Sequence, residues 1–304
     1  MQNRRIVLCI SSLSPGGAER SISTIANSLV RINYDVMILL QYPKSSSFYE
    51  VDERIWINSI EMGKPSSNLI VSLASNIRRI FKMRKVIHNF NPSAVISFID
   101  KNNILVTLAM LGSKIKVVIS ERNDPSQYMI SEPWNMIRPL VYRCANIVTA
   151  QSSSVANFMK MEWNLNKVEI IPNSLPENLP PPNPNVERGN ICLAVGRLVP
   201  QKDHDFMLRA WQAIHQKNPN WRLKIIGEGF LKEELNLKVE ELGLTRSVIF
   251  DGLAKNIWEE YQKAKVFILT SKYEGFPNAL MEALAFGCAC VSIKPGVIVF
   301  PETS

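Results

Sequence analysis

One stretch near the end of the chain constrains the fold most, because it joins a buried strand directly to a helix. The apolar run Val266–Leu269 is typical of a buried parallel strand, and the string SKYEGFPNALMEALAFG at 271–287 follows it. The helix that this string predicts ends on Gly287. Glu274 and Glu282 therefore flank the start of a helix at the carboxyl end of a strand, where open α/β sheets bind ligands. Helix N-termini attract anions and carboxylates accept hydrogen bonds from sugar hydroxyls, so the pattern suits a nucleoside diphosphate sugar.

Strands and helices alternate along the whole chain, which predicts α/β architecture with parallel sheets covered by helices. The predicted strands are Ile6–Ile10, Val36–Leu40, Ile55–Ile57, Ala94–Phe98, Lys116–Ile119, Ile147–Thr149, Ile191–Val195, Leu223–Ile226, Val248–Phe250, Val266–Leu269 and Cys290–Ile293. The predicted helices are Gly17–Arg31, Leu69–Asn89, Asn102–Leu111, Trp134–Arg143, Ser153–Met161, Asp205–Gln216, Phe230–Leu242, Ile257–Ala264 and Asn278–Phe286.

A proline-rich segment divides the alternation into two halves. Prolines at 172, 176, 180, 181, 182 and 184 cannot continue a helix or a central strand. We therefore expect an N-terminal domain over residues 1–171, a linker over 172–189 and a C-terminal domain over 190–304. A surface loop within one domain is the alternative reading of the same segment.

The string at 271–287 resembles the Glu-seven-Glu signature of the retaining family 4 glycosyltransferases. That resemblance implies a GT-B fold, in which two Rossmann-like domains face a cleft and the second binds the donor sugar nucleotide. It also implies that Glu274 contacts the donor sugar and Glu282 the ribose, with Gly275 and Phe276 beside the donor. The alternative is a strand–turn–helix unit whose carboxylates are only solvated.

Two further loops match this family. The string SPGGAER at 14–20 places Gly16 and Gly17 before a helix, and the resemblance puts these glycines beside the donor diphosphate. The string GRLVPQK at 196–202 supplies Arg197 and Lys202, which would neutralise the departing phosphates. Leu253 follows a strand in a segment that resembles the family's base-binding loop. A tight turn and solvated cations are the alternatives.

The acceptor side is less defined in the sequence. Asp100 follows one predicted strand, and Glu121 and Arg122 follow the next, in a string that resembles an acceptor-side loop of bacterial family members. His88, His204 and His215 are expected at the surface or at helix ends, so we assign no histidine base. No Asp-x-Asp motif stands at a matching place, so we expect no metal or other cofactor besides the donor substrate.

Positive charge gathers in the first half of the chain. Residues 1–185 hold 20 of the 35 basic and 13 of the 27 acidic side chains, which is +7 of the net charge of +8. The predicted helix at 69–89 combines apolar side chains at helical spacing with five Lys and Arg residues. It either lies on an anionic membrane surface or packs on the core with a solvated basic face. No nucleic-acid motif is visible, so we expect no nucleic-acid partner.

Length and segment composition set the remaining expectations. No apolar run approaches the ~20 residues of a membrane span, and the N-terminus lacks a signal-peptide pattern. We expect a cytoplasmic protein that can also bind the inner face of the cytoplasmic membrane. Beyond the strand Cys290–Ile293 the sequence stops resembling the family, which predicts a second domain truncated near its C-terminus.

Together these features predict a hexosyltransferase of surface polysaccharide, O-antigen or glycan assembly. It would move a hexose or N-acetylhexosamine from a nucleoside diphosphate sugar, most simply a UDP-sugar, to a lipid-linked or growing glycan. Two alternatives remain open. One is an inactive fragment that still binds sugar nucleotides, and the other is a sugar-nucleotide epimerase of the same fold.

Overall fold

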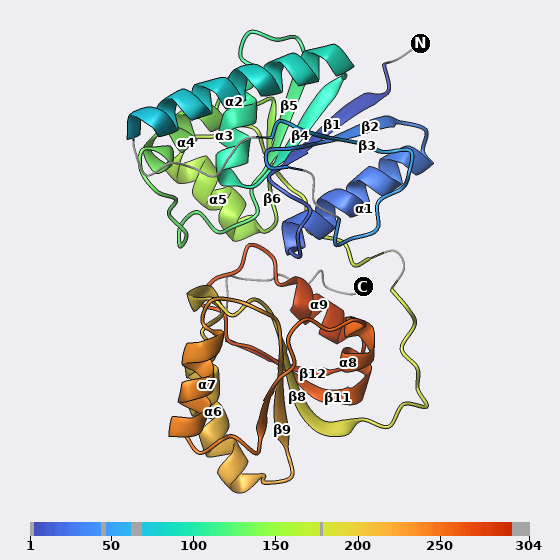
Figure 1. Cartoon of the computed structure of the whole chain (residues 1–304), viewed down its shortest axis with the longest axis vertical. Helices are drawn as coiled ribbons and strands as arrows, with labels where there is room; N and C mark the ends of the chain where they lie inside the picture. The colour runs from blue at the N-terminus through green and yellow to red at the C-terminus, as the bar shows by residue number, and fades with distance from the viewer. Residues whose placement is uncertain (1–2, 44–46, 62–68, 177–178, 294–304) are drawn as a thin grey trace. The chain divides into compact units, whose positions relative to one another are not determined.

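The computed structural model describes residues 3–43, 47–61, 69–176 and 179–293, which form two compact units that divide between Ser174 and Leu175 (Figure 1). The division lies within the segment 172–189 that the sequence assigns to a linker. The segment after Ile293, on which the predicted truncation rests, lies outside the described residues. No helix among the described residues is both long and apolar enough to cross a bilayer.

The first unit is a seven-stranded parallel sheet in the order β3-β2-β1-β4-β5-β6-β7. Its strands are β1 Arg5–Ile10, β2 Asp35–Leu40, β3 Trp56–Ser59, β4 Ala94–Phe98, β5 Lys116–Ser120, β6 Ile147–Ala150 and β7 Val168–Ile170. Its helices are α1 Gly17–Arg31, α2 Leu69–Phe90, α3 Asp100–Ala109, α4 Trp134–Tyr142 and α5 Ser153–Glu162. The chain runs outward from β1 in both directions, so the strand order reverses between β1 and β4.

Helices cover both faces of this sheet because its strands are apolar on both sides. On one face Ile22, Ala26 and Val30 of α1 pack on Leu8 and Ile38. On the other face the helices α2 to α5 pack on the alternate strand residues (Figure 1). The arrangement confirms the predicted α/β class with parallel sheets.

The second unit repeats the plan with five parallel strands in the order β10-β9-β8-β11-β12. Its strands are β8 Gly189–Val195, β9 Arg222–Ile226, β10 Val248–Phe250, β11 Ala264–Leu269 and β12 Ala289–Ser292. Its helices are the 3-10 turn η1 Pro200–Lys202, α6 His204–Lys217, α7 Lys232–Glu241, α8 Ile257–Lys263 and α9 Asn278–Ala285. Helices α6 and α7 cover one face and α8 and α9 the other. Here the strand order reverses between β8 and β11.

Most predicted elements shift by a residue or two at their ends, and three differences have a clear structural meaning or cause. The strand β7 was missed, because only Val168 of its three residues is buried and it is recognisable only through its pairing with β6. Helix α3 begins at Asp100 rather than Asn102, because Ile99 takes a φ of 73° and turns the chain abruptly out of β4. The strand predicted at Ile55–Ile57 is Trp56–Ser59.

Two glycines of the second unit allow backbone loops to touch at the carboxyl edge of the sheet. A Cβ on Gly227, whose φ is +150°, would lie 1.9 Å from the carbonyl oxygen of Gly196. A Cβ on Gly229 would lie 2.2 Å from the carbonyl oxygen of Leu198. Any other residue at these positions would push the loop after β9 away from the loop after β8.

Candidate functional site

Two loops of the second unit leave the sheet side by side. The loop 196–203 follows β8 and the loop 270–277 follows β11, and these strands are neighbours at the point where the strand order reverses. Open α/β sheets bind ligands at such a reversal, at the carboxyl ends of the strands. We call this pair of segments the donor-side loops.

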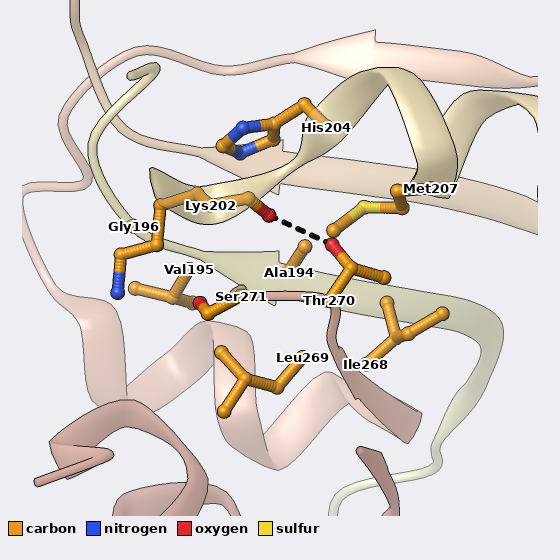
Figure 2. A pocket seen from close by; sticks show the side chains of 10 residues that line it. All are labelled: Ala194, Val195, Gly196, Lys202, His204, Met207, Ile268, Leu269, Thr270 and Ser271. Atoms are coloured by element: carbon orange, nitrogen blue, oxygen red, sulfur yellow. Dashed lines mark hydrogen bonds between the residues drawn. The ribbon is translucent and has the colours of Figure 1, made fainter. Parts of the chain in front are cut away.

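Hydrogen bonds tie the donor-side loops together. The Thr270 hydroxyl donates to the carbonyl oxygen of Lys202 at 2.9 Å (Figure 2) and also lies 3.3 Å from the carbonyl oxygen of Asp203. The Lys272 N–H donates to the Gln201 carbonyl at 2.9 Å. The Gln201 side-chain amide donates to the Tyr273 carbonyl, also at 2.9 Å. The backbone that carries Lys202 is therefore held against the backbone that carries Glu274.

Lys202 and Glu274 form an ion pair, with 2.5 Å between Nζ and Oε1. Their side chains are only 18% and 8% exposed, so solvent screens the pair less than it screens a surface pair. Lys202 also lines a small pocket with Gly196, Thr270 and Ser271 (Figure 2). The structure thus brings together two residues that the sequence predicts to act on neighbouring parts of one ligand.

Arg197, the other predicted phosphate ligand, is exposed and forms no ion pair within the described part of the chain. It lies in the same loop as Lys202, two residues after the end of β8. Its guanidinium is therefore open to solvent and to an incoming anion.

His204 stands at the start of α6, a helix end as predicted, but the sequence did not place it in this site. It is buried rather than at the surface, and it lines the same pocket as Lys202. Burial, with a smaller contribution from Lys202, lowers the pKa of His204 to about 4. The imidazole is consequently neutral at physiological pH and adds no charge to the donor-side loops.

Glu282 lies in α9 and is 3% exposed. Its Oε2 accepts a hydrogen bond of 2.9 Å from the Tyr261 hydroxyl, within the apolar layer between α8, α9 and the sheet. Glu282 and Glu274 therefore sit in different surroundings, one in the helix and one in the loop before it. The ribose role of Glu282 stays a prediction.

The remaining predicted donor contacts lie at loop positions. Gly275 and Phe276 are half-buried in the loop before α9, and Leu253 is half-exposed in the loop after β10. In the first unit Gly17 starts α1, and the backbone N–H of Gly16, just before it, donates a hydrogen bond to the Tyr49 hydroxyl oxygen. A Cβ on Gly16 would lie 2.1 Å from a Glu19 carboxylate oxygen, so a carboxylate already lies beside this helix start.

Asp100 stands where the strand order of the first unit reverses, in the first turn of α3. It is 5% exposed, and its Oδ2 accepts a 3.4 Å bond from the Asn123 amide. Burial and then the nearby Glu121 carboxylate raise the pKa of Asp100 above its ordinary value. The preceding Ile99 is a β-branched residue at positive φ, a strained conformation that is often found at functional sites.

Glu121 and Arg122 follow β5, the strand that pairs with β4, and Asp100 lies just after β4. The Glu121 carboxylate is buried and forms an ion pair with Arg138 of α4. The Arg122 guanidinium lies 4.3 Å from the centre of the Phe98 ring and donates to the Asn173 side chain. Burial lowers the pKa of Arg122 to about 10, against the opposing effect of Glu121. The structure therefore places Asp100, Glu121 and Arg122 at one sheet edge.

The helix α2 differs from the predicted arrangement in which its basic face is solvated. Three of its five basic side chains are engaged by the protein: Arg79 is buried, Lys82 donates to the Ile60 carbonyl, and Arg84 donates to the Ala109 and Leu111 carbonyls. Its exposed face instead carries apolar side chains together with two exposed cations. These exposed residues are Leu73, Ile77, Arg78, Phe81 and Lys85.

Sequence reasoning missed the supporting residues of both units. Thr270 and Gln201 belong to no recognisable motif, because a threonine after a strand and a glutamine in a turn are common. Arg138 and Tyr142 looked like ordinary members of an amphipathic helix. The one available signal was the cation at 138 among apolar neighbours, since arginine is almost never fully buried without a partner.

Two family models match the chain. The model described as Glycosyltransferase Family 4 matches residues 15–179, which is more than half of the chain. The model described as Glycosyl transferases group 1 matches residues 177–299, which include the donor-side loops.

Two named glycosyltransferases are similar to the chain over most of its length. The chain is 29% identical over 289 residues to a Campylobacter jejuni α-1,4-N-acetyl-D-galactosaminyltransferase, covering 95% of this chain and 79% of that protein. The full name of that protein gives its substrate as GalNAc-GalNAc-diNAcBac-PP-undecaprenol. The chain is also 29% identical over 300 residues to the amylovoran biosynthesis glycosyltransferase AmsD of Erwinia amylovora, covering 93% of this chain and 81% of that protein.

Solved structures share the fold. The Anabaena HepE protein, determined with UDP and glucose, superposes with a TM-score of 0.76 at 18% identity, over 97% of this chain and 82% of that one. The sucrose-phosphate synthase of Thermosynechococcus elongatus gives a TM-score of 0.78 at 17% identity, over 95% and 81%. At this identity the likeness concerns the fold, which is GT-B as predicted.

Proposed function

Since the chain belongs to glycosyltransferase family 4, we propose that it is a retaining enzyme that transfers a sugar from a UDP-sugar to a lipid-linked glycan. Its membership makes it a glycosyltransferase and favours that activity over the epimerase alternative. The donor, the stereochemistry and the acceptor are the proposed parts.

The Lys202–Glu274 pair is the observation that carries the proposal. The two hydrogen-bonded loops hold a cation and a carboxylate 2.5 Å apart. The pair offers adjacent sites for a phosphate and a sugar hydroxyl. Both loops lie at the strand-order reversal of the second unit, where a nucleotide is expected. In the proposed complex Lys202 and Arg197 bind the diphosphate and Glu274 binds the donor sugar.

The proposed chemistry needs little more than these charges. The bond from the anomeric carbon to the phosphate oxygen breaks, and the acceptor oxygen bonds the same face of the same carbon. The acceptor hydroxyl gives its proton to the departing phosphate. Lys202 and Arg197 stabilise the charge that develops on the leaving diphosphate. Glu282 would hold the ribose, which is remote from the bond that breaks.

The acceptor assignment rests on the relatives and on the first unit. Two Campylobacter jejuni relatives act on acceptors carried by undecaprenyl diphosphate and transfer N-acetylgalactosamine. We therefore propose an N-acetylhexosamine donor sugar and a polyprenyl diphosphate-linked glycan acceptor. Asp100 and Arg122 would bind the acceptor sugar, since a carboxylate and a guanidinium at one sheet edge suit hydroxyl and carbonyl groups.

A membrane contact would bring such an acceptor to the enzyme. The exposed face of α2 presents Leu73, Ile77 and Phe81 beside Arg78 and Lys85. Apolar side chains that can enter the headgroup region beside cations are the pattern of interfacial helices on anionic lipid. We propose that this face of α2 rests on the anionic inner leaflet of the membrane.

Purified protein should be incubated with UDP-GalNAc, UDP-GlcNAc, UDP-glucose or UDP-galactose and a polyprenyl diphosphate-linked glycan. We expect UDP release that depends on the acceptor, and a product whose new linkage has the α-configuration of the donor by NMR. A product of β-configuration would refute retention. Absence of UDP binding by calorimetry would refute the nucleotide assignment as a whole.

A further inference from the structure

A buried charged network lies behind the acceptor-side loop of the first unit. Glu121 follows β5, and Arg138 and Tyr142 stand one turn apart on α4. The side chains of Glu121 and Arg138 form an ion pair with no solvent exposure on either. The Tyr142 hydroxyl donates to the same carboxylate oxygen, Oε2, at 2.9 Å.

The other carboxylate oxygen of Glu121 is equally engaged. Oε1 accepts the backbone N–H of Arg122 at 3.0 Å and that of Asn123 at 3.2 Å. The carboxylate therefore has four donors, two from α4 and two from its own loop. Both carboxylate oxygens of Glu121 are therefore occupied by donors of the protein, and neither faces a ligand.

Stability alone does not explain why this unit has a buried ion pair instead of apolar side chains. The Nε and Nη1 of Arg138 have no hydrogen-bond partner in the described residues, although the group lies 5.0 Å from the Trp163 ring centre. Apolar side chains of similar volume commonly equal or exceed the stability of a buried ion pair. The feature that an apolar replacement could not reproduce is the capture of the two loop N–H groups.

The captured backbone carries one side chain, that of Asn123, which contacts Asp100. The Asn123 amide donates to Asp100, and the Arg122 guanidinium lies over the Phe98 ring. Fixing two consecutive N–H groups fixes the conformation of the residues between Glu121 and Asp124. The position of Arg122 and Asn123 relative to Asp100 thus depends on the orientation of the Glu121 carboxylate.

We propose that Glu121, held by Arg138 and Tyr142, is a positioning residue that shapes an acceptor-sugar site made by Asp100, Arg122 and Asn123. The inference deepens the proposed function and rests on it. It moves Glu121 from a residue that touches the acceptor to one that acts through its loop. It also assigns roles to Arg138 and Tyr142.

The decisive variant replaces both buried charges, Glu121→Met with Arg138→Met, which keeps the volume and leaves no charge unpaired. The second variant, Tyr142→Phe, removes one of the four donors and leaves the ring in place. Thr107→Val is the matched control, because Thr107 is a buried hydroxyl that bonds only within its own helix to the Asn103 carbonyl. Each protein is assayed for acceptor KM, donor KM, UDP affinity and amide exchange.

The double variant should raise the acceptor KM about tenfold or more and leave UDP affinity within about twofold, because the second unit is untouched. Exchange of the Arg122 and Asn123 amides should rise about tenfold in the same variant. Tyr142→Phe should give a smaller rise in acceptor KM, and Thr107→Val no change. A purely structural role would lower thermal stability without separating the acceptor KM from the donor KM.

An unchanged acceptor KM in a folded double variant overturns the inference. If the double variant does not fold, Tyr142→Phe decides, and an acceptor KM equal to that of the parent overturns it. The amide-exchange arm needs no substrate. A parent without transfer activity would refute the proposed function, and unchanged exchange of the two amides would still refute the loop capture separately.

Discussion

Replacing Glu274 by glutamine should tighten the binding of UDP while it lowers the rate of transfer. In the donor-free protein the Lys202 ammonium is neutralised by Glu274 at 2.5 Å. An incoming diphosphate must therefore share or displace that carboxylate. Glutamine keeps the size of the side chain and removes both the competition for Lys202 and the repulsion of the phosphates.

The burial of the pair sets the size of the effect. Exposed ion pairs contribute roughly 0.2–1 kcal/mol, whereas breaking a buried pair costs about 3–5 kcal/mol. With side chains 18% and 8% exposed, this pair lies between those limits, and we take about 1–2 kcal/mol. UDP should then bind the Glu274→Gln variant roughly 5–30-fold more tightly than the parent. Transfer should fall about 100-fold, because the contact to the reacting sugar is lost.

Titration calorimetry with UDP and steady-state transfer kinetics measure the two effects. Glu233→Gln is the matched control, since it removes one exposed carboxylate of α7 that forms no ion pair with Lys202. The part of the gain in UDP affinity that comes from freeing Lys202 should vanish when Lys202→Met is combined with Glu274→Gln. Weaker UDP binding by Glu274→Gln than by the parent would refute the competition between Glu274 and the diphosphate.

Arg197→Ala should lower transfer about 100-fold through the loss of a charge contact to the leaving phosphates, and kinetics within threefold of the parent would contradict this. Glu282→Gln should mainly weaken UDP binding, and titration calorimetry that shows parental affinity would remove Glu282 from the ribose site. Ile77→Ser combined with Phe81→Ser should reduce co-sedimentation with anionic vesicles, because both side chains are exposed apolar groups of α2. Equal sedimentation would argue against the membrane contact. His204 binds a proton less readily in the folded protein, with its pKa lowered from 6.5 to about 4, so the unfolded chain takes up the extra proton between those values. The free energy of unfolding should therefore be highest above pH 6.5 and fall by up to about 3 kcal/mol as the pH drops to 4. Urea unfolding of the parent should show this pH dependence, and urea unfolding of His204→Gln should not.

The sequence already contained the fold class and the positions of most elements. Buried parallel strands read as continuous apolar runs, and the helices between them follow their own period, so both signals are local. The donor-side loops were also visible, because glycine, arginine, lysine and glutamate stand at fixed distances from strand ends. Local signals of this kind do not depend on which strands become neighbours.

Partnerships between distant residues depended on tertiary structure. Lys202 and Glu274 are 72 positions apart, and only the pairing of β8 with β11 brings their loops together. The same is true of Thr270, whose hydroxyl has meaning only against the carbonyl of Lys202. The resemblance assigned both loops to one donor, but the direct ion pair between Lys202 and Glu274 was not predicted.

Burial was the second property that the chain alone did not determine. From the sequence, Glu121 was a candidate for contact with the acceptor and His204 was expected at the surface or at a helix end, yet both are buried. In the fold Arg138 enters from α4 to neutralise Glu121, while His204 is enclosed at the start of α6 and stays uncharged. Local sequence thus determined where strands end and which polar groups follow them. Only the tertiary structure decided which of those groups face solvent, because desolvation depends on every element packed around a side chain.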